Sequence, residues 1–419
     1  METASTYKPR FIEKRLLNCA KLFKSVMLLG PRQCGKTTLL RHVFPEVPLV
    51  TFERNRDTHG ARSDPDGFLK AFPPPLILDE AQYAPELFST LKRFMDLRDE
   101  RGQYFITGSQ NPLLLREVGE SMAGRVAILD LDFMDAPELA GIGDRTPWLN
   151  VWLADKGVAN SLKYTVLPES SGGALRALWR GGMPELARFD DASVHELLGS
   201  YFQTYVERDA RVPGEIRSEA DFVNFVTLCS ALTAQEVNFA KLGRDIGIVP
   251  ATAKKWFHNL RATFQWRELP AYSRNAVKRL SGKPKGYLSD TGLVCFLQHL
   301  DGVRAVNSSP LKGALFETWV VNSLRRQLGT ISAKPGCYHW RTIAGAEVDA
   351  VLDLGGVRYL VEVKCKTNLD VHDLSGIRAF RKTYNEANAP AVVVYTGDVC
   401  RPLDAHTLAM PWNAILNKT

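Results

Sequence analysis

Acidic side chains and a lysine alternate along AEVDAVLDLGGVRYLVEVKCK, residues 346–366. This stretch predicts two short strands joined by a turn that contains Gly355. Because strand side chains alternate between two faces, Glu362 shares a face with Lys364, and the short turn lets the carboxylate of Asp349 approach that of Glu362. Two adjacent carboxylates repel each other unless a cation lies between them. The stretch therefore predicts a cation site beside a lysine.

A second group of residues suited to chemistry is the loop in SVMLLGPRQCGKTTLLRHVF, which follows an apolar strand and precedes a helical pattern. Its residues fit G-x-x-x-x-G-K-[ST] without a mismatch. Backbone N–H groups would surround phosphate oxygens, Lys36 would neutralise phosphate charge and Thr37 would reach Mg²⁺. The loop thus predicts ATP and Mg²⁺ binding. The nucleotide-binding residues that we expect here are Gly30, Pro31, Arg32, Gln33, Cys34, Gly35, Lys36, Thr37 and Thr38.

Further polar residues follow two apolar stretches. The strand in PPPLILDEAQYAP ends in Asp79, expected to hold Mg²⁺ through water, and Glu80, expected to orient the attacking water. The strand in QYFITGSQN ends in Thr107 and Ser109, which are either γ-phosphate sensors or simple turn caps. Arg125 would supply positive charge to the transition state, in its own subunit or a neighbouring one, unless it is an ordinary surface arginine.

Composition limits the class of protein. A chain of 419 residues with 45% hydrophobic content predicts two to four domains, and a net charge of +7 permits nucleic-acid binding without requiring it. No segment reaches the roughly 20 apolar residues of a membrane span, and the start lacks a secretion signal, so we expect a cytoplasmic protein without membrane contact. The seven scattered cysteines argue against disulfides and zinc ribbons. Cys34 would fill a variable loop position, although a helix N-terminus can lower a thiol pKa.

The middle of the chain is helical by pattern, and two predicted helices flank a turn at Gly247. The second of these helices carries residues suited to DNA contact. The competing interpretation is a helical module that only joins domains or subunits. The residues expected to contact DNA are Thr252, Lys254, Lys255 and Arg261.

Several motifs in order give the chain a resemblance to a known family. GPRQCGKTTLL, LILDEAQ, WRGGMPELARF, YFQTYVERDAR, KPKGYLSDTGL, LFETWVVNSL and GAEVDAVLDL together resemble a prokaryotic family of AAA-superfamily ATPases with a carboxy-terminal domain of unknown function. The resemblance implies an α/β protein with a P-loop AAA-type ATPase domain over residues 1–150. It further implies a helical and winged-helix domain over 151–300 and a restriction-endonuclease-like domain over 301–419. AAA-type sites are commonly completed by a neighbouring subunit, so we expect a homo-oligomer such as a ring.

The carboxy-terminal pattern is a helix over 315–328, a strand, the hairpin quoted above, a helix over about 370–387 and the strand AVVVY. This order resembles the core of the PD-(D/E)xK nuclease superfamily. The resemblance implies that Asp349 and Glu362 bind one or two Mg²⁺ ions, with Mn²⁺ as a substitute, that Lys364 positions hydroxide and that Glu317 completes the shell. The opposing interpretation is a degenerate fold retained for docking or for holding DNA.

These observations favour an ATP-hydrolysing, DNA-associated protein that binds duplex or branched DNA and whose last domain is a metal-dependent nuclease or a relic of one. A second hypothesis is a signalling or regulatory switch, in which ATP controls assembly and the nuclease-like domain is a non-catalytic platform. A third is a structural role for the rear half without nucleic acid.

Overall fold

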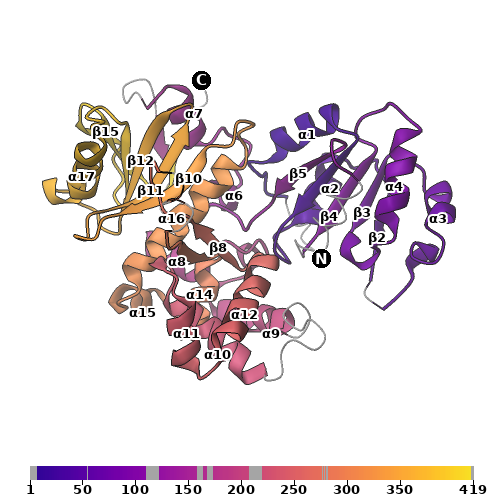
Figure 1. Cartoon of the computed structure of the whole chain (residues 1–419), viewed down its shortest axis with the longest axis horizontal. Coiled ribbons are helices and arrows are strands. Elements are labelled where there is room, and N and C mark those ends of the chain that lie inside the picture. The colour runs from indigo at the N-terminus through magenta and orange to yellow at the C-terminus, as the bar shows by residue number, and fades with distance from the viewer. Residues whose placement is uncertain are drawn as a thin grey trace.

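The computed structural model describes residues 7–53, 55–109, 122–157, 164–167, 173–206, 219–275, 277, 279 and 282–416. Three regions of the chain surround helix α16 (Lys312–Leu328). The first region, in indigo and purple, lies on one side, the last region, in orange and yellow, lies on the other, and the middle region lies below them (Figure 1). None of the helices in the described ranges combines the length and the apolar character that crossing a membrane requires.

The first region is built on a parallel sheet of five strands in the order β2, β3, β4, β1, β5. Strands β1, β3 and β4 are buried throughout, as expected for a parallel sheet covered on both faces. Alternate side chains of β1 enter different clusters: Leu28 packs with helices α1 and α2, whereas Met27 packs with α3 and α4. The strands are β1 (Ser25–Leu29), β2 (Leu49–Thr51), β3 (Leu76–Asp79), β4 (Tyr104–Gly108) and β5 (Val126–Asp130), and the helices are α1 (Glu13–Leu22), α2 (Lys36–Val43), α3 (Pro65–Ala71) and α4 (Leu87–Asp96).

The middle region contains two groups of elements. In the first, α8 (Gly173–Arg180) packs against α14 (Thr291–Leu297) and α15 (Val303–Ser308), and α14 also contacts α9 (Val194–Tyr205). The described elements of the second group have the order helix, strand, helix, helix, strand, strand, and the winged-helix assignment of this segment remains a prediction. Its predicted turn lies at Gly247, whose φ of 77° ends the first helix of the pair. The elements are α10 (Glu219–Ala231), β7 (Gln235–Glu236), α11 (Phe239–Ile246), α12 (Pro250–Ala262), β8 (Trp266–Leu269) and β9 (Lys285–Leu288).

The last region is a mixed sheet of six strands in the order β10, β11, β12, β13, β15, β14. Strands β10 to β12 are antiparallel, β12, β13 and β15 are parallel, and α16 and α17 cover opposite faces. The predicted helix over 370–387 is shorter, because a 3₁₀ turn precedes α17 and Asn385 ends it in a left-handed conformation. The elements are β10 (Gly336–Arg341), β11 (Glu347–Leu354), β12 (Val357–Lys364), α17 (Ser375–Tyr384), β13 (Ala391–Tyr395), β14 (Arg401–Asp404) and β15 (Thr407–Pro411).

The predicted hairpin is confirmed. Strands β11 and β12 pair from Leu354↔Val357 to Ala350↔Val361 around a two-residue turn. Both turn residues, Gly355 and Gly356, have positive φ, which suits a type I′ connection and explains why glycines stand there.

Two further elements connect the last region to the rest of the chain. Helix α7 (Trp148–Ala154) contacts α16, and its Trp152 meets Tyr359 of β12 edge to face. Strand β6 (Tyr164–Val166) pairs with β16 (Ala414–Leu416), so the end of the described chain returns to the segment that follows the first region. The domain boundaries at 150 and 300 remain predictions.

Helix α16 is joined to the first region by the buried carboxylate of Asp135. This residue caps α6 (Ala136–Leu139) in a capping box with Glu138. It also accepts a 2.6 Å hydrogen bond from Ser323 and lies 3.6 Å from the Arg326 guanidinium, both on α16. One buried acid therefore connects the sheet of the first region to the central helix.

We predict that Asp135→Ala destabilises the protein by about 2–4 kcal/mol, because it removes a helix cap and leaves a buried arginine without its carboxylate. The thermal unfolding midpoint, followed by circular dichroism, should fall by about 5 °C or more. Asp99→Ala is the matched control, since the Asp99 side chain is 97% exposed, and its midpoint should stay within about 1 °C of the wild type. Equal midpoints for the two variants would contradict this role of Asp135.

Candidate functional sites: a nucleotide loop and a carboxylate pocket

The predicted phosphate-binding loop connects β1 to α2. Gly35 caps α2 with a φ of 95°, and the helix begins at Lys36. The buried Lys36 ammonium donates to the backbone oxygens of Gly30 at 3.0 Å and Pro31 at 2.8 Å. The ammonium is thus folded into its own loop, where it can exchange these carbonyls for phosphate oxygens.

Two buried contacts fix the loop. A Cβ on Gly30 would lie 1.8 Å from the backbone oxygen of Leu131, so only glycine fits there. Arg10, which sequence reasoning missed, donates to the backbone oxygens of Cys34 at 2.7 Å and Asp132 at 2.6 Å and pairs with Glu138 at 3.1 Å. Arg10 therefore holds the loop in place through hydrogen bonds, although it is not part of the loop motif.

The remaining loop residues have different surroundings. Burial raises the pKa of the Cys34 thiol and outweighs any lowering of that pKa by the helix N-terminus. Cys34 therefore fills its loop position by packing. Arg32 donates to the Tyr83 hydroxyl at 2.7 Å, while Gln33 and Thr38 are exposed. Their contacts with nucleotide remain predictions.

Asp79 lies at the carboxyl end of β3, beside the loop. Its Oδ1 accepts hydrogen bonds of 2.7 Å from both Thr37 and Thr107, and its Oδ2 accepts one of 3.3 Å from Thr51. Mg²⁺ prefers carboxylate and hydroxyl oxygens together with waters. The Thr37 and Asp79 oxygens therefore fit an Mg²⁺ ion beside the loop, as predicted from the sequence.

Glu80 follows in a left-handed conformation, with φ of 56°. Its Oε2 accepts hydrogen bonds from the side chains of Gln82 at 2.5 Å and Ser109 at 2.9 Å. Sequence reasoning missed Gln82. Ser109 positions the Glu80 carboxylate, and a separate role as a phosphate sensor remains a prediction.

Arg125 lies at the other end of the sheet. Its backbone oxygen accepts from the N–H of Ser25, the first residue of β1, whereas the phosphate loop follows the last residue of β1. Its guanidinium forms a two-point ion pair with the partly exposed Asp96 at 2.7 and 2.8 Å. The prediction that Arg125 contacts the phosphate site of its own subunit is therefore wrong, because the arginine lies one strand length away from that site. A contribution to a neighbouring subunit remains a prediction.

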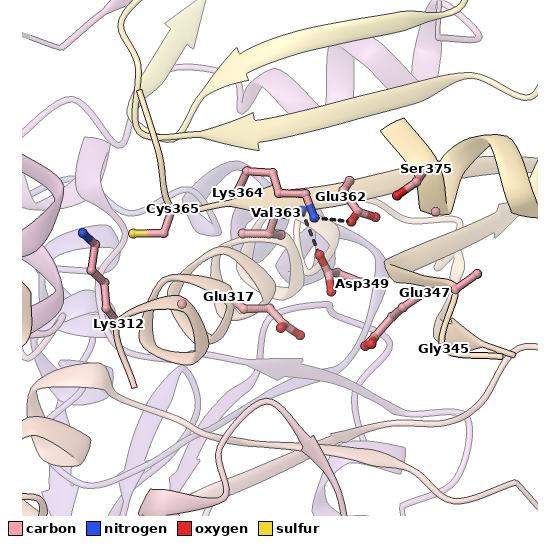
Figure 2. Close-up of a pocket in the computed structure, with 13 residues that line it drawn as sticks. Lys312, Glu317, Gly345, Glu347, Asp349, Glu362, Val363, Lys364, Cys365 and Ser375 are labelled. Atoms are coloured by element: carbon pink, nitrogen blue, oxygen red, sulfur yellow. Dashed lines mark hydrogen bonds and ion pairs between the residues drawn. The ribbon is translucent and has the colours of Figure 1, made fainter. Parts of the chain in front are cut away.

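The second site is a cavity of about 610 Å³ at one end of the hairpin. Carboxylates from α16, β11 and β12 line it, and the N-terminus of α17 borders it (Figure 2). Gly376 of α17 is required by close packing, since a Cβ there would lie 1.8 Å from the backbone oxygen of Glu347. The structure thus brings together the predicted residues Glu317, Asp349, Glu362 and Lys364, and adds Glu347.

The hairpin residues are held by direct contacts. Lys364 donates to Glu362 Oε1 at 2.7 Å, and Asp349 Oδ2 accepts from the backbone N–H of Val363 at 2.8 Å (Figure 2). Glu362 Oε2 is buried without a hydrogen-bond partner among the described residues. A buried carboxylate oxygen without a partner is costly, and a divalent cation would satisfy it.

A lysine that sequence reasoning missed contacts three of the carboxylates that line this pocket. Lys285 of β9 places its ammonium 2.6 Å from Glu317 Oε1, 2.5 Å from Glu347 Oε1 and 3.5 Å from Asp349 Oδ1. Tyr287, two residues later on the strand, donates to Glu317 Oε1 at 2.8 Å. No local pattern could reveal this contact, because β9 belongs to the middle region and is distant in sequence from the hairpin.

Burial shifts the titration of these groups. Burial, together with the nearby Asp349 carboxylate, raises the pKa of Glu317 to about 8. The same two causes raise the pKa of Glu362 well above its ordinary value, and burial raises that of Asp349. Although burial opposes its charged form, the carboxylates around Lys285 raise the pKa of that lysine. Burial and the neighbouring carboxylate therefore outweigh the two lysines at Glu317 and Glu362, and their pKa values stay raised.

The fit to a metal ion is limited to part of the pocket. Within the ranges that the structure describes, no three His, Cys, Asp or Glu side chains are already arranged to hold a metal ion. Mg²⁺ is often bound through one or two carboxylates, with waters in the remaining positions. Asp349 and Glu362 meet this requirement, whereas Glu317 and Glu347 contact the Lys285 ammonium.

The residues predicted to contact DNA lie on α12. Lys254 and Lys255 are exposed, Thr252 is half-buried, and Arg261 pairs with Glu268 at 3.3 Å. The neighbouring helix α11 adds two more exposed cations, Lys241 and Arg244. These two helices thus present positive charge to solvent, although Arg261 already has a partner.

Three family profiles match the chain. Residues 22–140 match one described as an AAA domain, and residues 174–304 and 312–415 match two domains of unknown function, DUF8612 and DUF4143. Uncharacterized proteins of Mycobacterium bovis and Mycobacterium tuberculosis are 29% identical over 393 residues, or 93% of this chain and 80% of each relative.

Two similar solved structures are a Walker-type ATPase of Pyrococcus abyssi and the RuvB Holliday junction branch migration motor of Thermotoga maritima. The first has 16% identity and a TM-score of 0.44 over 70% of this chain and 99% of that one. The second has 17% identity and a TM-score of 0.30 over 65% and 94%. These TM-scores are too low to infer the function of this chain from either structure. The matched profile and the loop geometry together show that the first region is an AAA-type P-loop ATPase domain.

Proposed function

We propose that this protein hydrolyses ATP, associates with duplex or branched DNA, and hydrolyses phosphodiester bonds at the carboxylate pocket with Mg²⁺ or Mn²⁺. The observation that carries the proposal is the Glu362 carboxylate beside Asp349. One of its oxygens accepts from Lys364, and the other is buried with no hydrogen-bond partner among the described residues. That arrangement is suited to a divalent ion and a phosphate.

In the pocket, Asp349 and Glu362 would hold the ion, which when bound supplies a Lewis acid and a hydroxide nucleophile at neutral pH. The Lys364 side chain is 30% exposed, so its ammonium can reach a phosphate while it orients Glu362. Its positive charge would offset the extra negative charge that develops on the phosphorus centre. The cavity of about 610 Å³ has room for a phosphodiester group.

At the nucleotide site, Lys36 would bind phosphate oxygens while Thr37 and Asp79 would hold Mg²⁺, which supplies charge neutralisation when bound. Glu80, oriented by Gln82 and Ser109, would position the attacking water. A homo-oligomer such as a ring would allow Arg125 of one subunit to approach the nucleotide of another.

DNA association rests on the positive charge of α11 and α12. Four exposed cations on two adjacent helices would neutralise phosphates and release counterions. The exposed cations on these helices are Lys241, Arg244, Lys254 and Lys255.

One observation favours the second candidate function, an ATP-controlled switch with a non-catalytic pocket. Lys285 already compensates Glu317 and Glu347 without any metal, as expected if the pocket only ties the middle region to the last one. In that case the DNA reactions would be independent of Asp349.

We predict that Lys36→Ala lowers ATP hydrolysis at least about 100-fold, because the phosphates lose their main charge partner. Glu80→Gln should bind ATP normally and stall turnover, since only the positioning of water is lost. Phosphate release and binding of a fluorescent ATP analogue measure the two effects, with the exposed Lys70→Ala as control. Wild-type turnover in the Lys36 variant would refute the site.

We predict Mn²⁺-dependent cleavage of labelled DNA by the wild type and a loss of at least about 100-fold in Asp349→Ala, because the ion loses a ligand. Chelation of the metal should abolish cleavage as well. Asp353→Ala is the matched control on the same strand, since Asp353 is outside the pocket lining. Equal cleavage by wild type and Asp349→Ala would identify a contaminant and remove the nuclease proposal.

We predict that the double variant Lys254→Ala, Lys255→Ala weakens duplex binding and makes the slope of log affinity against log salt less negative by about 2, one unit for each lost phosphate contact. Fluorescence anisotropy across a KCl series measures this slope. Lys14→Ala on α1, another exposed lysine, should leave it unchanged. If the double variant keeps the wild-type slope, α12 is a joining module and not a DNA contact.

A further inference from the structure

Lys285 reaches the carboxylate pocket from a different part of the chain. It stands at the start of β9, the central strand of the winged-helix sheet, and its side chain is 6% exposed. Its ammonium lies within 2.6 Å of one oxygen each on Glu317 and Glu347. A lysine so deeply buried among carboxylates occupies the kind of position that a metal cation takes in other acidic pockets.

The backbone holds Lys285 in place. Residues that alternate along a strand share a face, and both Lys285 and Tyr287 bond Glu317. Gly286 faces the other way, where a Cβ would lie 2.0 Å from the ring of Trp266 on β8. One face of strand β9 therefore packs closely against Trp266, and the other face bonds Glu317 of the pocket.

Main-chain bonds add a second attachment between these regions. The N–H of Tyr272 donates to the backbone oxygen of His339 on β10 at 2.6 Å, and the N–H of His339 donates to that of Pro270 at 3.0 Å. The segment that follows β8 thus runs along the edge of the last sheet. Because two regions are hydrogen-bonded here, the lysine is a fixed part of the pocket.

The ammonium and a metal ion compete for the same oxygens. Mg²⁺ requires ligand oxygens at about 2.0–2.1 Å, so an ion on Glu317 and Glu347 would lie in the space of the ammonium, and two cations so close repel strongly. The position between Asp349 and Glu362 is different. The ammonium is 3.5 Å from Asp349 Oδ1, farther than from Glu317 or Glu347, and Glu362 Oε2 is buried and has no hydrogen-bond partner in the described part of the chain.

We propose that the Lys285 ammonium takes the place of a second divalent ion, so that the pocket holds one divalent ion, on Asp349 and Glu362, in place of two. This inference rests on the metal site of the proposed function and adds its stoichiometry. Glu317 and Glu347 are then partners of the lysine, and strand β9 of the middle region supplies a charge that compensates the pocket.

Mn²⁺ binding to the full-length protein tests the proposal, by calorimetry and by the electron paramagnetic resonance signal of the unbound ion. The wild type should bind one ion in the pocket, lost in Glu362→Gln. Lys285→Met should bind a second ion, or bind the first at least about tenfold more tightly, because a positive charge has been removed. Lys312→Met is the matched control, since Lys312 lines the same pocket but bonds Asn307, and it should keep the wild-type stoichiometry and affinity.

Two ions in the wild type, or unchanged Mn²⁺ binding in Lys285→Met, would overturn the proposal. The experiment distinguishes failure of the proposed metal-dependent cleavage from failure of the proposed role of Lys285. No ion in the wild type but one in Lys285→Met would refute the proposed metal-dependent cleavage and support exclusion by Lys285. No ion in either protein would overturn both.

A second variant and a second readout cover the case in which Lys285→Met folds poorly. Glu317→Gln should keep the single wild-type ion, because Glu317 bonds Lys285; loss of the ion would make Glu317 a metal ligand and overturn the proposal. Mn²⁺ should also raise the unfolding midpoint of Lys285→Met by several degrees more than that of the wild type, since the ion replaces the missing charge. Equal midpoint shifts would contradict that replacement.

Discussion

The arrangement of the three regions depends on the compensation of buried negative charge along α16. Near the start of this helix Glu317 contacts Lys285 and Tyr287 of the middle region, and near its end Arg326 and Ser323 contact Asp135 of the first region. A buried carboxylate without a partner destabilises the folded protein, so breaking either set of contacts would cost free energy of folding. The same helix thus contributes Glu317 to the pocket and contacts the ATPase domain through Ser323 and Arg326.

These contacts also form a continuous path between the two sites. Arg10 bonds the backbone of the phosphate loop and the carboxylate of Glu138, which shares a capping box with Asp135, and Asp135 accepts from Ser323 on α16. Glu317 lies less than two turns earlier on that helix. A change in the loop on nucleotide binding would therefore reach the pocket through buried polar contacts, provided that this network has two stable arrangements.

Sequence patterns revealed the parts of the fold that short-range chemistry determines. The phosphate loop and the hairpin are local in sequence, and strand alternation correctly brings Glu362 and Lys364 together. Lys285 and Arg10 were missed because their partners are distant in sequence, whereas Gln82 bonds Glu80 two residues away and was missed although it stands in the same motif. The motifs WRGGMPEL and YLSDTGL show the same limit: they meet through a 2.7 Å hydrogen bond from the Gly182 N–H to Asp290, a contact that neither motif indicates alone.

The central claim is that the ATPase domain and the proposed DNA-binding helices α11 and α12 work as one unit. ATP hydrolysis by the wild type, measured with single-stranded, duplex and four-way DNA and without DNA over a KCl series, tests it most directly. The account predicts that duplex or four-way DNA raises the rate several-fold and that the stimulation declines as salt increases. A rate that is the same with every DNA and without DNA, at all salt concentrations, would contradict it.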